Sequence, residues 1–169
     1  ILQGVPSIIC GILVYMWVVR AMHSYSAVAG AVALALMMIP MITRSTEEAL
    51  NMLPGSLLES GLALGSSYTS VMLHVLLPSA IGAIITGILL SISRVMGETA
   101  PLMVTALGAT YVNLDVTSPT SAVSLLIWEF YNDPNLVDLI WSTALFLLIL
   151  ILALNLTAKT IAAKRGVKR

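Results

Sequence analysis

The sequence has few charged residues, and this shortage excludes an ordinary soluble domain. Charged residues make up 9% of the 169 positions and apolar residues 59%, whereas soluble domains carry roughly a quarter charged residues. The mean hydropathy is +1.00. Eight cations balance eight anions, so the chain has no overall basic field that would attract nucleic acid. The composition therefore predicts a membrane protein.

Cysteine and histidine are almost missing as well. The chain has one cysteine, Cys10, and two histidines, His23 and His74. A single cysteine cannot form an internal disulfide, and it supplies no thiolate cluster for a metal. The histidines are far apart and flank apolar segments, so we interpret both as interfacial packing residues. We expect no metal site.

The motifs of enzymes are also missing. The sequence has no GxxxxGK[ST] motif, so we expect no ATPase site of its own. It has no Ser/His or Asp/Asp constellation in its apolar segments, which disfavours an intramembrane enzyme. No basic region precedes the first apolar run after Ile1, so that run is not a signal peptide. We expect the chain to be the C-terminal portion of a longer protein.

Long apolar segments dominate what is present. They cover residues 5–19, 26–43, 71–95 and 136–157. A membrane-crossing helix needs about 20 apolar residues, which the first segment does not quite reach. Pro40 should kink the second segment. The pattern predicts an all-α polytopic membrane protein with about four spans, in a single transmembrane domain over residues 1–169.

The third apolar segment has to break. Residues 71–112 as one helix would be about 60 Å long, twice the thickness of the hydrocarbon layer. Gly97 and Pro101 are the residues that interrupt helices. Residues 102–112 are too short to cross alone, so we expect them to be re-entrant or packed near one face.

The distribution of charge predicts the orientation. The tail from Lys159 carries five cations, and basic segments stay in the cytoplasm. Four spans then place the interval 44–67 on the cytoplasmic side with the C-terminus. The acidic connector 113–136 lies outside, and its part 121–131 is amphipathic enough for an interfacial helix.

The interval 44–67 has the pattern of two short helices. Ser45–Glu48 resembles a helix start, with a capping hydroxyl and acidic residues in the first turn. Pro54 ends this helix, Ser56 can cap a second one over residues 57–64, and Gly65 closes it. The second helix is too short to span a membrane and too apolar to remain solvated. We therefore expect it to dock against another protein.

Arg94 and Glu98 are opposite charges between two apolar blocks. Their spacing of four places them on one helical face. An arginine at a helix centre costs about 2.5–3.5 kcal/mol. The pair either neutralises itself or serves an ion path or its gate. We favour the path, because two leucines would cost less and the planar guanidinium suits phosphate-like oxyanions.

One loop resembles the "EAA–G–I–LP" loop of ABC importer permeases. That pattern is Glu-Ala-Ala, three residues, Gly, nine residues, Ile, one residue and Leu-Pro. This chain has Glu59-Ser60-Gly61, Gly65, Val75 and Leu77-Pro78 at these positions. The resemblance implies a coupling helix that inserts into a cleft of the ATPase. The residues that would carry this coupling are Glu59, Ser60, Gly61, Ala63, Gly65, Leu77 and Pro78.

A longer pattern resembles the PstA family of phosphate permeases within the type I ABC importers. It is carried by Glu47-Glu48, by Thr86-Gly87 and by Arg94-Val-Met-Gly-Glu-Thr-Ala-Pro-Leu102. The resemblance implies a phosphate importer in the inner membrane, with Arg94, Glu98 and Thr99 along the path or its gate. It also implies a PstC-like second permease, two PstB-like ATPases that bind ATP-Mg, and a PstS-like phosphate-binding protein.

Two alternatives remain open at this stage. A PstC-type permease, or one for molybdate or sulfate, shares the ABC architecture; PstC proteins usually continue Gly-Glu-Thr with Met rather than Ala-Pro-Leu. An ATP-independent channel or secondary transporter could also use the Arg94–Glu98 pair. It would leave the docked helix and Gly65 unexplained.

Overall fold

The computed structural model describes residues 4–109, 111 and 113–166, with side chains to residue 160. This part of the chain is helical, and its single β-bridge joins Leu107 to Thr120. Three helical runs are long and apolar enough to cross a membrane. The architecture is therefore that of a polytopic all-α membrane protein, as the composition predicts.

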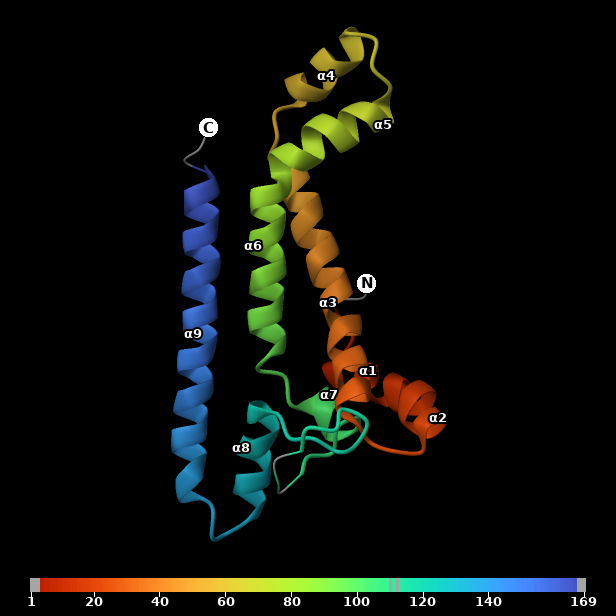
Figure 1. The fold of residues 1–169 in the computed structure, drawn as a ribbon. Helices are drawn as coiled ribbons and strands as arrows, with labels where there is room; N and C mark the ends of the chain where they lie inside the picture. The colour runs from red at the N-terminus through yellow and green to blue at the C-terminus, as the bar shows by residue number, and fades with distance from the viewer. Residues whose placement is uncertain (1–3, 110, 112, 167–169) are drawn as a thin grey trace.

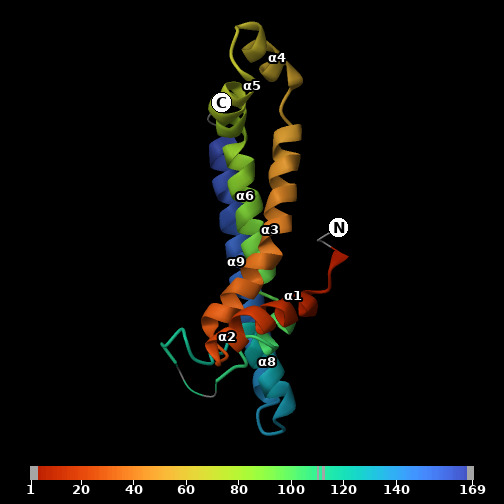
Figure 2. The same cartoon turned by 90° about the vertical axis from the view of Figure 1, so that its right-hand side faces the viewer.

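The three long runs lie side by side (Figure 1). Helix α3 covers Ala27–Asn51, and α9 covers Asp138–Gly166. The middle run consists of α5 (Tyr68–Val71), the π-helical turn η3 (Met72–Leu76) and α6 (Leu77–Val95). Both Figures 1 and 2 place α6 between α3 and α9. At 1.5 Å per residue, each run exceeds the roughly 30 Å of the hydrocarbon layer.

The first apolar segment does not form the fourth span that we expect from the sequence. It folds as α1 (Ser7–Val14), the π-helical turn η2 (Tyr15–Val19) and α2 (Arg20–Met22). Figure 2 shows this run lying across the end of α3 rather than along it. The run Ser7–Met22 is about 24 Å long, which is too short for a crossing. The described chain therefore has three candidate spans.

The expected helix start at Ser45–Glu48 is wrong, because α3 continues through it to Asn51. The chain has no helix-breaking residue between Pro40 and Pro54, and the acidic residues there are good helix formers. Arg44 Nε lies 3.0 Å from Glu48 Oε1, an i,i+4 ion pair that supports the helix by a few tenths of a kcal/mol. Pro40 lies inside α3 without ending it.

The short helix after this point is confirmed. Helix α4 covers Gly55–Ala63, and its N-cap is Pro54 rather than Ser56. Gly65 follows with φ of +83°, a backbone conformation that glycine adopts without strain. In Figure 1, α4 lies at the same end of the molecule as the C-terminus.

The break after the third apolar segment is also confirmed. Helix α6 ends at Val95, and the short α7 covers Ala100–Met103. The next residues pack at the end of α3, where the Ser26 amide donates to the Thr105 carbonyl at 3.1 Å. The connector then forms α8 (Val123–Asn132), which matches the expected helix 121–131.

Helices α3 and α6 approach each other most closely where a glycine faces a serine. A Cβ on Gly87 would overlap the Ser45 hydroxyl and lie 2.7 Å from the Ser45 Cβ. Gly87 and Ser91 one turn later are buried, whereas Ala83 one turn earlier is exposed. A small residue at position 87 thus permits this contact.

The connector contains a carboxylate, that of Asp115, whose titration can be measured. Thr117 donates to Asp115 Oδ1 from its hydroxyl at 2.7 Å and from its amide at 2.9 Å. These hydrogen bonds, the side-chain bond first, lower the pKa of Asp115. Because the folded pKa is depressed, this stabilisation is present above the unfolded pKa and is lost as pH falls through the folded pKa.

We expect Thr117→Val to raise the Asp115 pKa toward its ordinary value, because the hydroxyl donor is removed and the amide donor remains. A carboxyl-carbon NMR titration measures the change. Thr120→Val is the matched control, since the Thr120 hydroxyl donates to the Ser118 carbonyl instead. An unchanged Asp115 titration in Thr117→Val would contradict the assignment.

Candidate functional site

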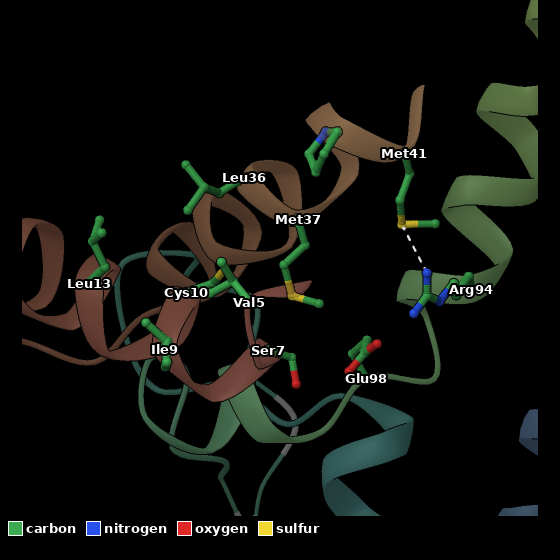
Figure 3. Close-up of a pocket in the computed structure, with 11 residues that line it drawn as sticks. Val5, Ser7, Ile9, Cys10, Leu13, Leu36, Met37, Met41, Arg94 and Glu98 are labelled. Atoms are coloured by element: carbon green, nitrogen blue, oxygen red, sulfur yellow. Dashed lines mark hydrogen bonds between the residues drawn. The ribbon is translucent and has the colours of Figure 1, made fainter. Parts of the chain in front are cut away.

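A cavity of about 640 Å³ lies between α1, α3 and the C-terminal end of α6. Figure 3 shows its walls, with α1 and α3 on one side and the end of α6 on the other. Its volume is within the range of small-molecule sites. The lining side chains are mostly apolar, with one cation and one anion. They are Val5, Ser7, Ile9, Cys10, Leu13, Leu36, Met37, Pro40, Met41, Arg94 and Glu98.

The structure brings Arg94 and Glu98 into the same cavity but not onto the same helix. Arg94 is in the last turn of α6, and Glu98 follows in the loop after α6 ends at Val95. The expectation of one shared helical face is therefore wrong, because the break precedes Glu98. Within the described residues, the only ion pair is Arg44–Glu48, so the two cavity charges are not paired directly.

The Arg94 guanidinium keeps most of its donors unused. Among the described residues, its one hydrogen-bond contact is from Nη1 to the Met41 sulfur at 3.7 Å, and a thioether is a weak acceptor. Figure 3 shows Arg94 and Glu98 both directed into the cavity. The guanidinium can thus donate two parallel hydrogen bonds to a planar or tetrahedral oxyanion. The Glu98 carboxylate balances the charge of Arg94 in the cavity wall.

Helix α3 contributes a wall of methionines that the sequence reading did not single out. Met37 and Met41 are one turn apart and line the cavity beside Pro40. Because Pro40 has no amide hydrogen, the carbonyl of Leu36 lacks its usual intrahelical donor there. The i,i+4 spacing of the two methionines around the proline is the signal that could have identified this wall.

Thr99 does not line this cavity. Its hydroxyl donates to the carbonyl of Ser124 at 3.3 Å, and the Ser124 hydroxyl donates to the carbonyl of Glu98 at 3.1 Å. Ser124 is buried in the first turn of α8. Two hydrogen bonds therefore tie the turn that carries Glu98 to α8. Ser124 is a positioning residue that the sequence alone does not reveal.

The sequence-predicted coupling residues form a second candidate site at the opposite end of α6. Glu59, Ser60 and Ala63 are exposed on α4, as is Gly65 just after it. Leu64 beside them has 86% of its surface exposed. Figure 1 shows α4 projecting beyond the three long helices. An exposed leucine on a short projecting helix is suited to insertion into a cleft of a partner protein.

Gly61, Leu77 and Pro78 have different surroundings. Gly61 faces the following helix, and a Cβ there would lie 2.7 Å from a Val71 methyl group. Val71 is buried at 2% exposure by this contact. Leu77 and Pro78 begin α6, away from the exposed face of α4. The structure thus brings Glu59–Gly65 together on one element and places Leu77–Pro78 at the bend that follows.

The described residues contain no group of three or more His, Cys, Asp or Glu side chains that could hold a metal ion. Cys10 lines the cavity, but it is half-buried among apolar side chains. The cavity offers a cation with unused hydrogen-bond donors, and α4 presents an exposed face.

Comparison with known proteins identifies the family of the chain. Residues 1–164 match the family described as binding-protein-dependent transport system inner membrane component. The phosphate transport system permease protein PstA of Yersinia pestis is 38% identical over 167 residues, which cover 98% of this chain and 57% of that protein. PstA of Xylella fastidiosa strain 9a5c is 36% identical over 170 residues, covering 99% and 59%.

A third relative is a mycobacterial protein. PstA 1 of Mycobacterium tuberculosis strain H37Rv is 38% identical over 165 residues, covering 95% of this chain and 54% of that protein. The chain thus spans slightly more than half the length of these curated relatives. No solved structure matches the chain significantly.

Proposed function

Because the chain belongs to the binding-protein-dependent transport system inner membrane component family, we propose that it forms part of the permease subunit of an ATP-driven importer of inorganic phosphate. The chain is an integral inner-membrane protein. The relatives named above are phosphate permeases, and the residues of this chain suit the same substrate.

The observation that carries the proposal is the Arg94 guanidinium in the cavity. Arg94 lies in the last turn of a run that is apolar enough to span a membrane. Among the described residues, its guanidinium contacts only a methionine sulfur. A cation with unused donors in a cavity is suited to bind a passing anion, and phosphate oxygens match the guanidinium geometry.

In this proposal the two ends of α6 have different tasks. Arg94 and Glu98 line the path, and the exposed face of α4 receives the movement of an ATPase subunit. The run from Tyr68 to Val95 is one continuous helical connection between them. The proposed orientation places α4 and the C-terminus in the cytoplasm, in agreement with the basic tail.

The proposed function needs partners that supply the remaining parts. A PstC-like permease would complete the path, and a PstS-like protein would deliver phosphate from outside. Two PstB-like ATPases would bind ATP-Mg and close on the coupling helices. In this proposal the partner subunits hydrolyse ATP, because the chain has no phosphate-binding loop motif of its own.

Reconstituted transport tests the proposal directly. The full-length protein, assembled with its partner subunits in proteoliposomes, should import radiolabelled phosphate only with ATP and the binding protein. Uptake measured with molybdate or sulfate at equal concentration distinguishes a phosphate permease from a permease for these related oxyanions. Uptake that proceeds without ATP would favour a channel or secondary transporter, and uptake of sulfate in preference to phosphate would change the substrate.

Gly65 provides a test of the coupling role of α4. We expect Gly65→Val to weaken association with the ATPase about five- to thirtyfold, because a β-branched residue is strained by one or two kcal/mol at φ of +83°. Gly65→Asn is the matched control, since asparagine tolerates this conformation and a Cβ there meets no atom within 4 Å. Co-purification of the ATPase with the permease measures the effect.

Equal ATPase recovery in the valine and asparagine variants would contradict a role for this turn in presenting α4. The stability of the permease alone, measured by thermal unfolding in detergent, separates lost docking from lost folding. A Glu59→Gln change in the same assay tests the exposed acidic residue of α4 independently of backbone strain.

A further inference from the structure

A second, polar cavity lies at the far end of α3 from α4. It has a volume of about 380 Å³ and is formed where η2 and α2 turn into α3. It shares no lining residue with the Arg94 cavity. Its lining includes a cation, a histidine, two phenols and a hydroxyl but no carboxylate. These residues are Tyr15, Val19, Arg20, His23, Ser24 and Tyr25.

Arg20 is an unpaired cation at this cavity. It is exposed, and among the residues that the structure describes it has no ion-pair or hydrogen-bond partner. His23 lies next to it with a left-handed φ of 53°. A non-glycine residue in this conformation persists where its surroundings hold it in place. The turn therefore presents two nitrogen-bearing side chains to one pocket with no acidic group to neutralise them.

The two tyrosines add neutral donors. Their ring centroids are 5.9 Å apart, with 38° between the planes. The neighbouring Tyr15 phenol, followed by partial burial, raises the pKa of Tyr25, so the phenol stays protonated at neutral pH. A protonated phenol offers an O–H donor. The Ser24 hydroxyl is already used, since it donates to the Tyr25 carbonyl at 2.9 Å.

The surroundings of the pocket are those of a membrane boundary. Helix α3, a candidate span, begins just after it at Ala27. On the run that leads into it, Trp17 is 72% exposed, Met16 57% and Ile12 47%. Tryptophan and tyrosine gather at the level of lipid headgroups, and basic side chains reach the same level. An apolar surface thus lies beside a cationic pocket.

We propose that this pocket binds a phosphate-type oxyanion, presented either by the headgroup of an anionic phospholipid or as free inorganic phosphate. The Arg20 guanidinium provides two parallel donors for the phosphate oxygens. His23 and the tyrosine phenols offer donors from the other walls. In the phospholipid case, the acyl chains lie along the exposed apolar side chains of α1 and η2. The proposal does not depend on the transport activity of the Arg94 cavity.

Native mass spectrometry of the full-length protein in its complex tests the phospholipid case. The complex is exchanged into mixed phosphatidylglycerol and phosphatidylcholine, and retained lipids are counted. We expect Arg20→Gln to weaken phosphatidylglycerol retention about tenfold, the change that about 1.4 kcal/mol produces. Arg20→Gln combined with His23→Asn should weaken it further. Asparagine tolerates the left-handed backbone at position 23.

Arg44→Gln is the matched control. It removes the same charge from an exposed site at the other end of α3, where Arg44 is already paired with Glu48. Retention of phosphatidylglycerol should be unchanged in this variant. Arg20→Lys, which keeps the charge but not the planar fork, should recover only part of the retention.

Equilibrium dialysis with radiolabelled phosphate, in phosphatidylcholine alone, tests the free-ion case. A loss of one bound phosphate per complex in Arg20→Gln identifies free phosphate as the ligand. Arg20-dependent retention of phosphatidylglycerol identifies the headgroup. The proposal is overturned if neither phosphatidylglycerol retention nor phosphate stoichiometry changes in Arg20→Gln or in the double variant.

Discussion

Arg94→Gln is expected to lower phosphate uptake about a hundredfold while the permease still assembles with its partners. Glutamine removes the positive charge and the paired donors, and two charge-assisted hydrogen bonds together are worth about 3 kcal/mol. Arg94→Lys should keep about a tenth of the wild-type uptake, because a point charge replaces the planar fork. Initial rates of radiolabelled phosphate uptake, normalised to assembled complex, measure both effects.

The matched control for this prediction is Lys159→Gln. It removes one cation from an exposed position on α9, and we expect uptake close to wild type. Normal uptake in both Arg94 variants would reduce Arg94 to a structural residue of the cavity wall. Exchanging the charges, as Arg94→Glu with Glu98→Arg, then separates position from pairing. The two residues are not directly paired in the structure, so we expect the exchange not to restore uptake.

Gly87→Leu is expected to prevent stable packing of α3 against α6. Even one added carbon overlaps the Ser45 hydroxyl and approaches the Ser45 Cβ to 2.7 Å, so one of the helices has to shift. Overpacking of this kind costs about 1–3 kcal/mol for small additions and more for larger ones. Gly87→Ala should therefore lower the thermal stability of the purified protein, and Gly87→Leu should abolish its recovery from the membrane.

The serine on the opposite helix allows a rescue experiment. Ser45→Gly removes the atoms that the added methyl group would meet, so Ser45→Gly with Gly87→Ala should regain most of the stability lost in Gly87→Ala alone. Gly55→Ala is the control, because a Cβ at this helical position meets nothing within 4 Å and should leave stability equal or slightly higher. Equal melting of Gly87→Ala and the wild type would show that the contact is not close in solution.

The sequence predicts those features of the fold that depend on neighbouring residues. The segments 26–43, 71–95 and 136–157 are strongly apolar, and each is a long helix in the structure. Gly97 and Pro101 predict the break, because each of them disrupts the helical backbone at its own position. The length of helix α4 also follows from the glycine and proline at its ends.

Other features depend on contacts between residues that are distant in the sequence, and the sequence does not predict them. The spacing of Arg94 and Glu98 suggests a shared helical face only if the helix continues, and it ends one residue after Arg94. The first apolar run resembles a short span in composition, yet it lies across α3. The pairing of Gly87 with Ser45 and of Ser124 with Glu98 joins residues more than 25 positions apart. No local pattern identifies such pairs.

The contact between α3 and α6 at Ser45 and Gly87 lies part-way along both helices and can act as a fulcrum. On one side of this contact, Met41 of α3 meets Arg94 of α6; on the other side, both helices lead to α4. The straight parts of α6 on the two sides are about 15 Å and about 10 Å long. If the helices rock about this contact, separating them at the α4 end brings them together at Arg94, and the displacement there is about two-thirds as large.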